Sequence, residues 1–177
     1  MMNRIKKIIA FQILATAFIV SCNQGNKAKE QNNTETQDSV APVLKDKNKA
    51  EAYEHYIHLK DALVASDLKE AQIAGKELAD ELKKIEGCEI TAGVATKIAN
   101  ASDLKEQRAK FTPLSSDIIA MMKNTEIVSG NLYVEYCPMA NDGKGGYWLS
   151  SNSEIENPYY GDEMLNCGEV KEVLKKK

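Results

Sequence analysis

The sequence lacks the features that define several large protein classes. Its longest apolar run, residues 8–20, is shorter than the roughly 20 residues that a membrane-spanning helix needs. Basic residues are not in excess, because 23 Lys and Arg stand against 26 Asp and Glu for a net charge of −3, so no nucleic-acid partner is expected. No Gly-x-Ser-x-Gly elbow, phosphate loop or His-Glu-x-x-His helix is present, and we predict that the protein is not an enzyme.

The N-terminus resembles the signal peptide of bacterial lipoproteins. A basic start leads into the apolar run, which ends in Ile19-Val20-Ser21-Cys22, similar to a lipobox. The resemblance implies that residues 1–21 are removed and that Cys22 carries the lipid. We therefore expect a lipid-anchored protein of the bacterial cell envelope, on the periplasmic or outer-surface side, where disulfides persist. The alternative is an ordinary signal peptide with an incidental cysteine.

Composition divides the remaining chain into two parts. Residues 23–39 contain one apolar residue, Ala28, and such a segment buries too little surface to offset the entropy of ordering it. We predict that residues 22–46 are the lipidated N-terminus and a flexible polar tether. Residues 47–177 are predicted to form a single folded domain of a length typical of one core.

Helical periodicity dominates the first part of this domain. Apolar residues at i, i+3, i+4 and i+7 predict a helix over 53–64. Asp67 with Glu70, and Asp103 with Glu106, are variant capping boxes that open a second and a fourth helix, and residues 88–99 suit a shorter third helix. Short connections favour an antiparallel bundle.

The pattern changes after residue 130. Residues 132–136 and 146–149 are rich in β-formers and flank a Gly-rich turn, which predicts a β-hairpin. Residues 157–161 form another turn, and 169–176 suit a last short helix. The predicted fold class is mainly α, an antiparallel bundle of about four helices with a small C-terminal β-hairpin and loop region.

Four sulfur side chains, those of Cys137, Met139, Met164 and Cys167, mark the C-terminal third. Thiolates and thioethers are soft ligands that select Cu(I) or Ag(I), and the absence of a Cys-x-x-Cys pair argues against a zinc ribbon. Three interpretations of the two cysteines stay open: ligands of a soft metal, a structural disulfide, or two unpaired buried thiols. The chemistry is similar to that of the periplasmic copper chaperones, in which a tryptophan face covers the metal, and this likeness implies that role for Trp148. The alternative is that Trp148 belongs to the core.

The two histidines, His55 and His58, stand three residues apart and share a helix face. They either assist the sulfur ligands, if the hairpin folds back onto the first helix, or form a solvated pair. Cys88 and the Met121-Met122 pair are predicted to be packing residues.

Several stretches resemble the bacterial family called domain of unknown function 3347. They are His58-Leu-Lys-Asp-Ala-Leu63, Gln107-Arg-Ala-Lys-Phe111 with Leu114-Ser115, Cys137-Pro-Met-Ala140, Tyr147-Trp-Leu149, and Asn157-Pro-Tyr-Tyr-Gly161 with Met164 and Cys167. The resemblance extends from about residue 53 to 174. Members occur as small lipoproteins and as extensions of the periplasmic adaptor subunits of heavy-metal efflux pumps. The family has no established activity, so the resemblance implies metal handling and nothing catalytic.

These observations lead to one leading expectation and one alternative. The leading expectation is a lipid-anchored periplasmic protein that binds Cu(I) or Ag(I) and acts as a buffer or donor in heavy-metal efflux. Its partners would be the membrane, through Cys22, and a periplasmic efflux adaptor or metal chaperone. The alternative is a helical interaction module of an envelope complex that binds no metal and is stapled by a Cys137–Cys167 disulfide.

Overall fold

A computed structural model describes residues 41–177, which lie within one compact unit. The predicted signal peptide, Cys22 and most of the tether fall outside the described residues. The elements, in chain order, are β1 (Val43–Leu44), α1 (Lys47–Val64), α2 (Leu68–Leu82), α3 (Glu89–Ala99), α4 (Leu104–Lys123), β2 (Ile127–Ser129), β3 (Asn131–Cys137), α5 (Ala140–Gly143), β4 (Gly146–Ser150), the 3-10 turn η1 (Gly161–Glu163) and β5 (Glu169–Lys175).

Helices α2 and α4 begin at the two predicted capping boxes. The Asp67 carboxylate accepts a hydrogen bond from the Glu70 backbone N–H at 3.0 Å, and Asp103 accepts one from Glu106 at 2.8 Å. Each cap satisfies a backbone donor that the first turn of a helix leaves without a partner. The sequence Ala-Ser-Asp-Leu-Lys-Glu occurs twice, at residues 65–70 and 101–106, and it caps a helix each time.

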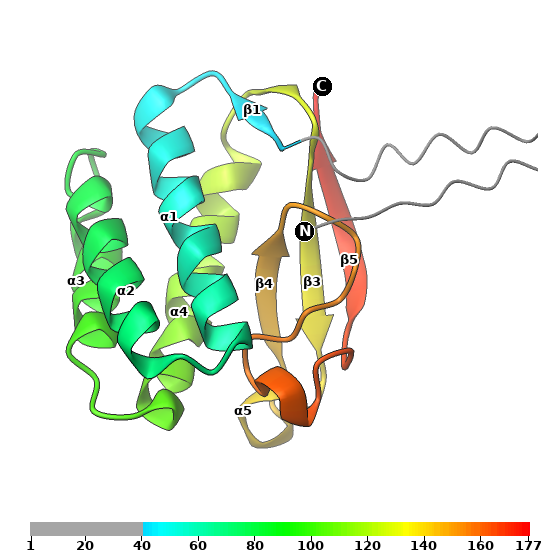
Figure 1. Ribbon diagram of the computed structural model, residues 1–177. Coiled ribbons are helices and arrows are strands. Elements are labelled where there is room, and N and C mark those ends of the chain that lie inside the picture. The colour runs from blue at the N-terminus through cyan, green and yellow to red at the C-terminus, as the bar shows by residue number, and fades with distance from the viewer. Residues whose placement is uncertain (1–40) are drawn as a thin grey trace, which may run out of the picture. The chain divides into compact units, whose positions relative to one another are not determined.

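The four long helices form the predicted antiparallel bundle. In chain order, α1 packs on α2, α2 on α3, and α3 on α4, as Figure 1 shows. The mainly α fold with a small C-terminal β region is confirmed. Among residues 41–177, no helix is both long enough and apolar enough to cross a membrane.

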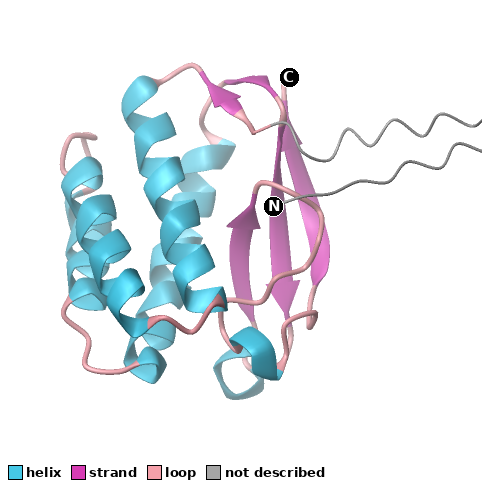
Figure 2. Ribbon diagram, in the orientation of Figure 1, coloured by secondary structure: helices cyan, strands magenta, loops and turns pink. Residues whose placement is uncertain are grey.

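The β region has two parts, shown as magenta arrows in Figure 2. Strands β4, β3 and β5 form an antiparallel sheet with β3 in the centre, and the predicted hairpin is its β3–β4 pair. A separate short ribbon pairs β1 with β2. Because β1 takes part in this pairing and Leu44 is buried, ordered structure begins before residue 47, inside the segment predicted as tether.

The prediction of a short helix over residues 169–176 is wrong. This segment is β5, which pairs with the edge of β3 that β4 leaves free. Val170 and Leu174 are its half-buried positions, and their spacing suits a helix as well as a strand. The choice is made by backbone pairing with β3, which outweighs local helix propensity.

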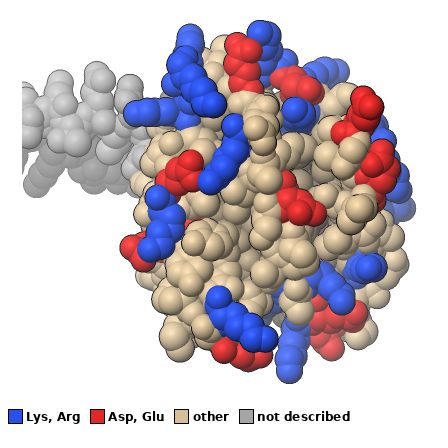
Figure 3. Space-filling model, turned by 180° about the vertical axis from the view of Figure 1, so that it is seen from behind, with Lys and Arg blue, Asp and Glu red and all other residues tan. Residues whose placement is uncertain are grey.

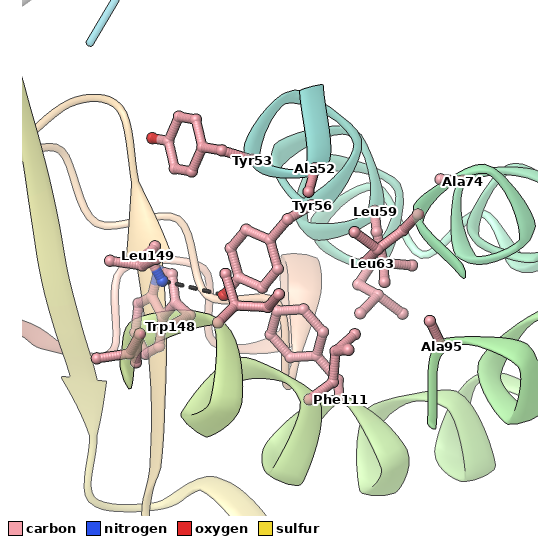
Figure 4. Close-up of a cluster of buried hydrophobic side chains, with 14 of the residues drawn as sticks. Ala52, Tyr53, Tyr56, Leu59, Leu63, Ala74, Ala95, Phe111, Trp148 and Leu149 are labelled. Atoms are coloured by element: carbon pink, nitrogen blue, oxygen red, sulfur yellow. Dashed lines mark hydrogen bonds between the residues drawn. The ribbon is translucent and has the colours of Figure 1, made fainter. Parts of the chain in front are cut away.

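One core joins the bundle to the sheet, and Figure 4 shows its centre. The Tyr56 ring of α1 stacks on Phe111 of α4 at 5.5 Å between ring centroids. The Tyr56 hydroxyl lies 2.6 Å from Ser115 Oγ and accepts the Leu149 backbone N–H of β4 at 3.0 Å. A buried tyrosine therefore fixes the sheet against both helices.

Candidate functional site

Cys137 and Cys167 lie side by side at one end of the three-stranded sheet. Cys137 is the last residue of β3 and is fully buried, whereas Cys167 lies just before β5 and is half-buried. Tyr136 pairs with Glu169 across the ladder, so the residues just beyond that pair meet at the same corner. The Sγ atoms of Cys137 and Cys167 are 2.7 Å apart.

The two methionines belong to the same turns, and we call the group Cys137, Met139, Met164 and Cys167 the sulfur corner. The Cys167 backbone N–H donates to the Met164 carbonyl at 3.0 Å. Met139 follows β3, its backbone contacts the Cys167 thiol, and its side chain is 51% exposed. The corner therefore combines a buried thiol, a half-buried thiol and an exposed thioether.

A buried asparagine holds the loop that carries Cys167. Asn157 Nδ2 donates to the Cys167 carbonyl at 3.0 Å, and the Asn157 backbone N–H donates to the Leu165 carbonyl at 2.8 Å. The Asn157 side-chain oxygen accepts the Tyr159 N–H at 2.8 Å. This asparagine, the first residue of the predicted turn 157–161, places Cys167 against the end of β3.

The Cys167 thiol has a pKa above its ordinary value. The largest cause is its hydrogen bond with Cys137, followed by burial, while the Met139 backbone lowers the pKa. The Cys167 side chain is therefore a protonated thiol near neutral pH. Binding of a metal, which requires thiolate, would release protons.

Trp148 is a fully buried core residue next to this corner. Its ring meets Tyr159 edge-on, with centroids 6.1 Å apart. The Gly168 backbone, adjacent to Cys167, approaches the ring so closely that an added Cβ would stand 2.8 Å from the indole. Core packing therefore accounts for its position.

The histidines lie in a different cluster. His55 Nδ1 is 3.3 Å from Glu77 Oε2, and His58 Nδ1 is 3.5 Å from the same oxygen. His58 Nε2 lies 2.8 Å from Glu70 Oε1. Among residues 41–177, these two histidines with Glu77 make up the one group of three or more His, Cys, Asp or Glu side chains with ligand atoms within 4.8 Å of one another, and neither C-terminal cysteine belongs to it.

Of the two alternatives for the histidines, the structure brings neither His55 nor His58 into the sulfur corner, and it places both beside Glu77 on α2. The reason is that α1 turns this face towards α2, not towards the hairpin. Glu70 and Glu77 were missed because charged side chains on a helix face usually point to solvent. Their seven-residue spacing on α2, opposite a histidine pair on α1, is the signal that identifies them.

A third group of buried polar atoms lies between α1 and the sheet. Glu135, directly opposite Trp148 in the β3–β4 ladder, is fully buried and neither carboxylate oxygen reaches hydrogen-bond geometry with a partner. The same holds for Trp148 Nε1 and the Tyr53 hydroxyl. Burial raises the pKa of Glu135 to about 8, although the nearby Trp148 N–H and the Lys60 ammonium lower it. Glu135 is therefore mostly protonated at neutral pH.

Comparison with known proteins finds a similar family over part of the chain. The sequence profile of the family described as "Protein of unknown function (DUF3347)" matches residues 52–130. Over this segment, which is less than half of the chain, the protein is similar to that family. No curated protein and no solved structure matches the chain.

The DUF3347 match begins inside α1, contains most of the helical bundle and ends before β3. Two of the stretches that carry the resemblance, residues 58–63 and 107–115, lie inside it, whereas those around Cys137, Trp148 and Cys167 lie beyond it. The match therefore includes the histidine cluster and leaves out the sulfur corner.

Arg108 shows what one residue of the DUF3347 segment does. Its Nη2 donates to the Leu63 carbonyl at 3.0 Å and to Ser66 Oγ at 2.9 Å, and its Nε donates to the Pro158 carbonyl at 3.0 Å. One guanidinium thereby ties the α1–α2 junction to the turn that supports Cys167. Arg108 therefore joins the matched segment to the C-terminal part.

Proposed function

We propose that the protein is a lipid-anchored envelope protein that binds Cu(I) or Ag(I) at the sulfur corner, as a buffer or as a donor in heavy-metal efflux. The observation that carries the proposal is the 2.7 Å contact between the Sγ atoms of Cys137 and Cys167, in turns that also hold Met139 and Met164. Thiolate and thioether ligands favour soft monovalent ions over harder cations.

Metal binding requires a small opening of this contact. Two sulfurs that bind one ion at about 2.3 Å each stand about 3.8–4.6 Å apart. Cys137 is fixed in β3, so the change belongs to Cys167, which lies in a half-buried loop before β5. A shift of about 1 Å in that loop is sufficient on the same geometry.

The exposed side chain of Met139 suits the exchange of an ion with a partner. An ion that is bound by a ligand at the surface can pass to a second protein. The buried Cys137 retains the ion when no partner is present. The proposed partners are a periplasmic efflux adaptor or a metal chaperone. Anchoring through Cys22, which lies outside the described residues, would keep the domain close to membrane-bound partners.

The same contact favours a second candidate function. A disulfide needs a separation of about 2.05 Å, so a smaller shift closes a bond than opens a metal site. Such a bridge closes a loop of about 30 residues and stabilises the fold by about 3–4 kcal/mol in the chain-entropy account. The protein would then be a stapled helical interaction module that binds no metal.

A Cu(I) competition titration separates the two functions. Residues 41–177, reduced and free of oxygen, compete with a coloured Cu(I) chelator. We expect one tightly bound ion, loss of that binding in Cys137→Ser, and about tenfold weaker binding, or about 1.4 kcal/mol, in the double variant Met139→Ala with Met164→Ala. Cys88→Ser, which removes a thiol outside the corner, is the matched control and should bind as the wild type does.

Two results would contradict the metal proposal. One is no measurable Cu(I) affinity in the reduced wild type, and the other is equal affinity in the double methionine variant. Thiol titration of protein isolated without reductant tests the alternative, since a stapled module has two fewer reactive thiols and binds no Cu(I) until it is reduced.

A further inference from the structure

The faces of α1 and α2 that meet carry a set of nitrogen and oxygen ligands. His55 and His58 lie one helical turn apart on α1, and Glu70 and Glu77 lie two turns apart on α2. The side chains of His55, His58 and Glu77 are 33%, 40% and 45% exposed, so an ion can reach them from solvent. No sulfur atom takes part in this cluster.

We propose that His55, His58 and Glu77 form a second metal site, for a borderline divalent cation such as Zn²⁺. Its ligand atoms are His55 Nδ1, His58 Nδ1 and one Glu77 carboxylate oxygen. Imidazole and carboxylate suit Zn²⁺ and Cu²⁺, whereas Cu(I) and Ag(I) prefer sulfur. The site is therefore distinct in chemistry from the sulfur corner.

The spacing of the ligand atoms supports this assignment. Nitrogen and oxygen ligands about 2.0–2.1 Å from a tetrahedral ion stand about 3.3–3.5 Å from one another. The distances from Glu77 Oε2 to His55 Nδ1 and to His58 Nδ1 are 3.3 and 3.5 Å. One ligand atom from each of the three residues lies within 4.8 Å of the others, so a rearrangement of side chains brings all three to these separations.

Glu70 contacts the ring nitrogen of His58 that is not a proposed metal ligand. Its Oε1 lies 2.8 Å from His58 Nε2, at hydrogen-bond distance. When Nε2 donates to that carboxylate, the His58 proton is held on Nε2 and the lone pair of Nδ1 is free for a metal. A carboxylate that orients a histidine in this way is a common partner of metal-binding imidazoles.

Three protein ligands leave the fourth tetrahedral position for water or for a ligand from another molecule. Such open sites are typical of exchangeable or catalytic zinc, whereas structural zinc has four protein ligands. The partial exposure of all three side chains agrees with an exchangeable ion. The site would accordingly load and release its metal as the divalent ion concentration changes.

Zinc titration of a cysteine-free protein tests the site without any contribution from the sulfur corner. Residues 41–177 with Cys88→Ser, Cys137→Ser and Cys167→Ser are titrated with Zn²⁺ by calorimetry. We expect one bound ion, and at least tenfold weaker binding after His55→Gln, His58→Gln or Glu77→Gln. Glu54→Gln, on an exposed position of the same helix, should leave the affinity unchanged.

The Glu70→Ala variant distinguishes a carboxylate that orients a metal ligand from one that only forms a surface ion pair. We expect about 10-fold weaker Zn²⁺ binding with unchanged stoichiometry, because this carboxylate only orients a ligand. Nitrogen-15 NMR of the histidine rings should show the proton of His58 on Nε2 and a zinc-induced shift of Nδ1. Absence of saturable Zn²⁺ binding, or equal affinity in the Glu77→Gln and Glu54→Gln proteins, would overturn the proposal. A soft-metal result at the sulfur corner bears on neither outcome.

Discussion

At the scale of single residues, Glu135 is the most unusual group in the described part of the chain. A carboxylate in the centre of a sheet, with no hydrogen-bond partner for either oxygen, is costly to ionise. Lys60 is buried nearby, but its ammonium group is paired with Asp61 and Glu156. Glu135 therefore remains protonated in the folded protein over a wide pH range.

Substitution of Glu135 should change how stability depends on pH. The folded-state pKa of about 8 lies above the ordinary value of 4.5, so the folded protein binds one more proton than the unfolded chain between these values. Stability from this group is fully present below pH 4.5 and is lost as the pH rises to about 8. We expect Glu135→Gln to be more stable than the wild type at pH 9 by on the order of 2 kcal/mol, with a smaller difference at pH 5.

Denaturant unfolding at pH 5 and pH 9 measures this effect. Glu54→Gln, at an exposed position of α1, is the matched control and should preserve the pH profile of the wild type. Identical pH profiles for Glu135→Gln and the wild type would show that Glu135 is ionised in the folded state.

At the scale of elements, glycines distinguish two helices of the bundle. Gly93 in α3 has open space where a Cβ would stand, whereas a Cβ on Gly75 in α2 would lie 3.1 Å from the Ala99 backbone nitrogen and 3.3 Å from the Ala95 carbonyl. The first glycine only weakens its helix. The second allows α2 and α3 to approach closely.

Alanine at the two positions should therefore act in opposite directions. Gly93→Ala should raise the free energy of unfolding by about 0.5–1 kcal/mol, because alanine is the better helix former. Gly75→Ala should lower it by about 1–3 kcal/mol, because the helices must move apart. Thermal or urea unfolding of both variants checks this, and stabilisation by Gly75→Ala would contradict the packing described for α2 and α3.

Some elements of this structure follow from the sequence, and others do not. Helix starts follow from Asp67 and Asp103, since capping is a local interaction. The β5 strand does not follow from the sequence, because the spacing of Val170 and Leu174 suits a helix as well as a strand. Residues 169–175 form a strand because they pair with the free edge of β3. The sulfur side chains could be identified as candidate ligands from their residue type alone. The pairing of His55 with Glu77 could not, because it depends on which faces of α1 and α2 pack together.

At the scale of the whole molecule, the chain contains a segment that is similar to the DUF3347 family and a C-terminal part that lies beyond the match. The DUF3347 match ends at residue 130, between the bundle with its histidine cluster and the sheet with its sulfur corner. Basic and acidic side chains intermix on the face in Figure 3, without one large region of either sign. The two proposed sites thus lie on separate structural parts, and their ligand types assign them to different classes of metal.

X-ray absorption spectroscopy at the copper edge of the Cu(I)-loaded, reduced protein tests the central claim most directly. If Cys137, Cys167 and the two methionines hold the ion, the first shell contains sulfur at about 2.3 Å. No imidazole scattering is expected, because His55 and His58 lie beside Glu77 of α2. A first shell of nitrogen or oxygen would contradict the proposal that the sulfur corner binds the metal.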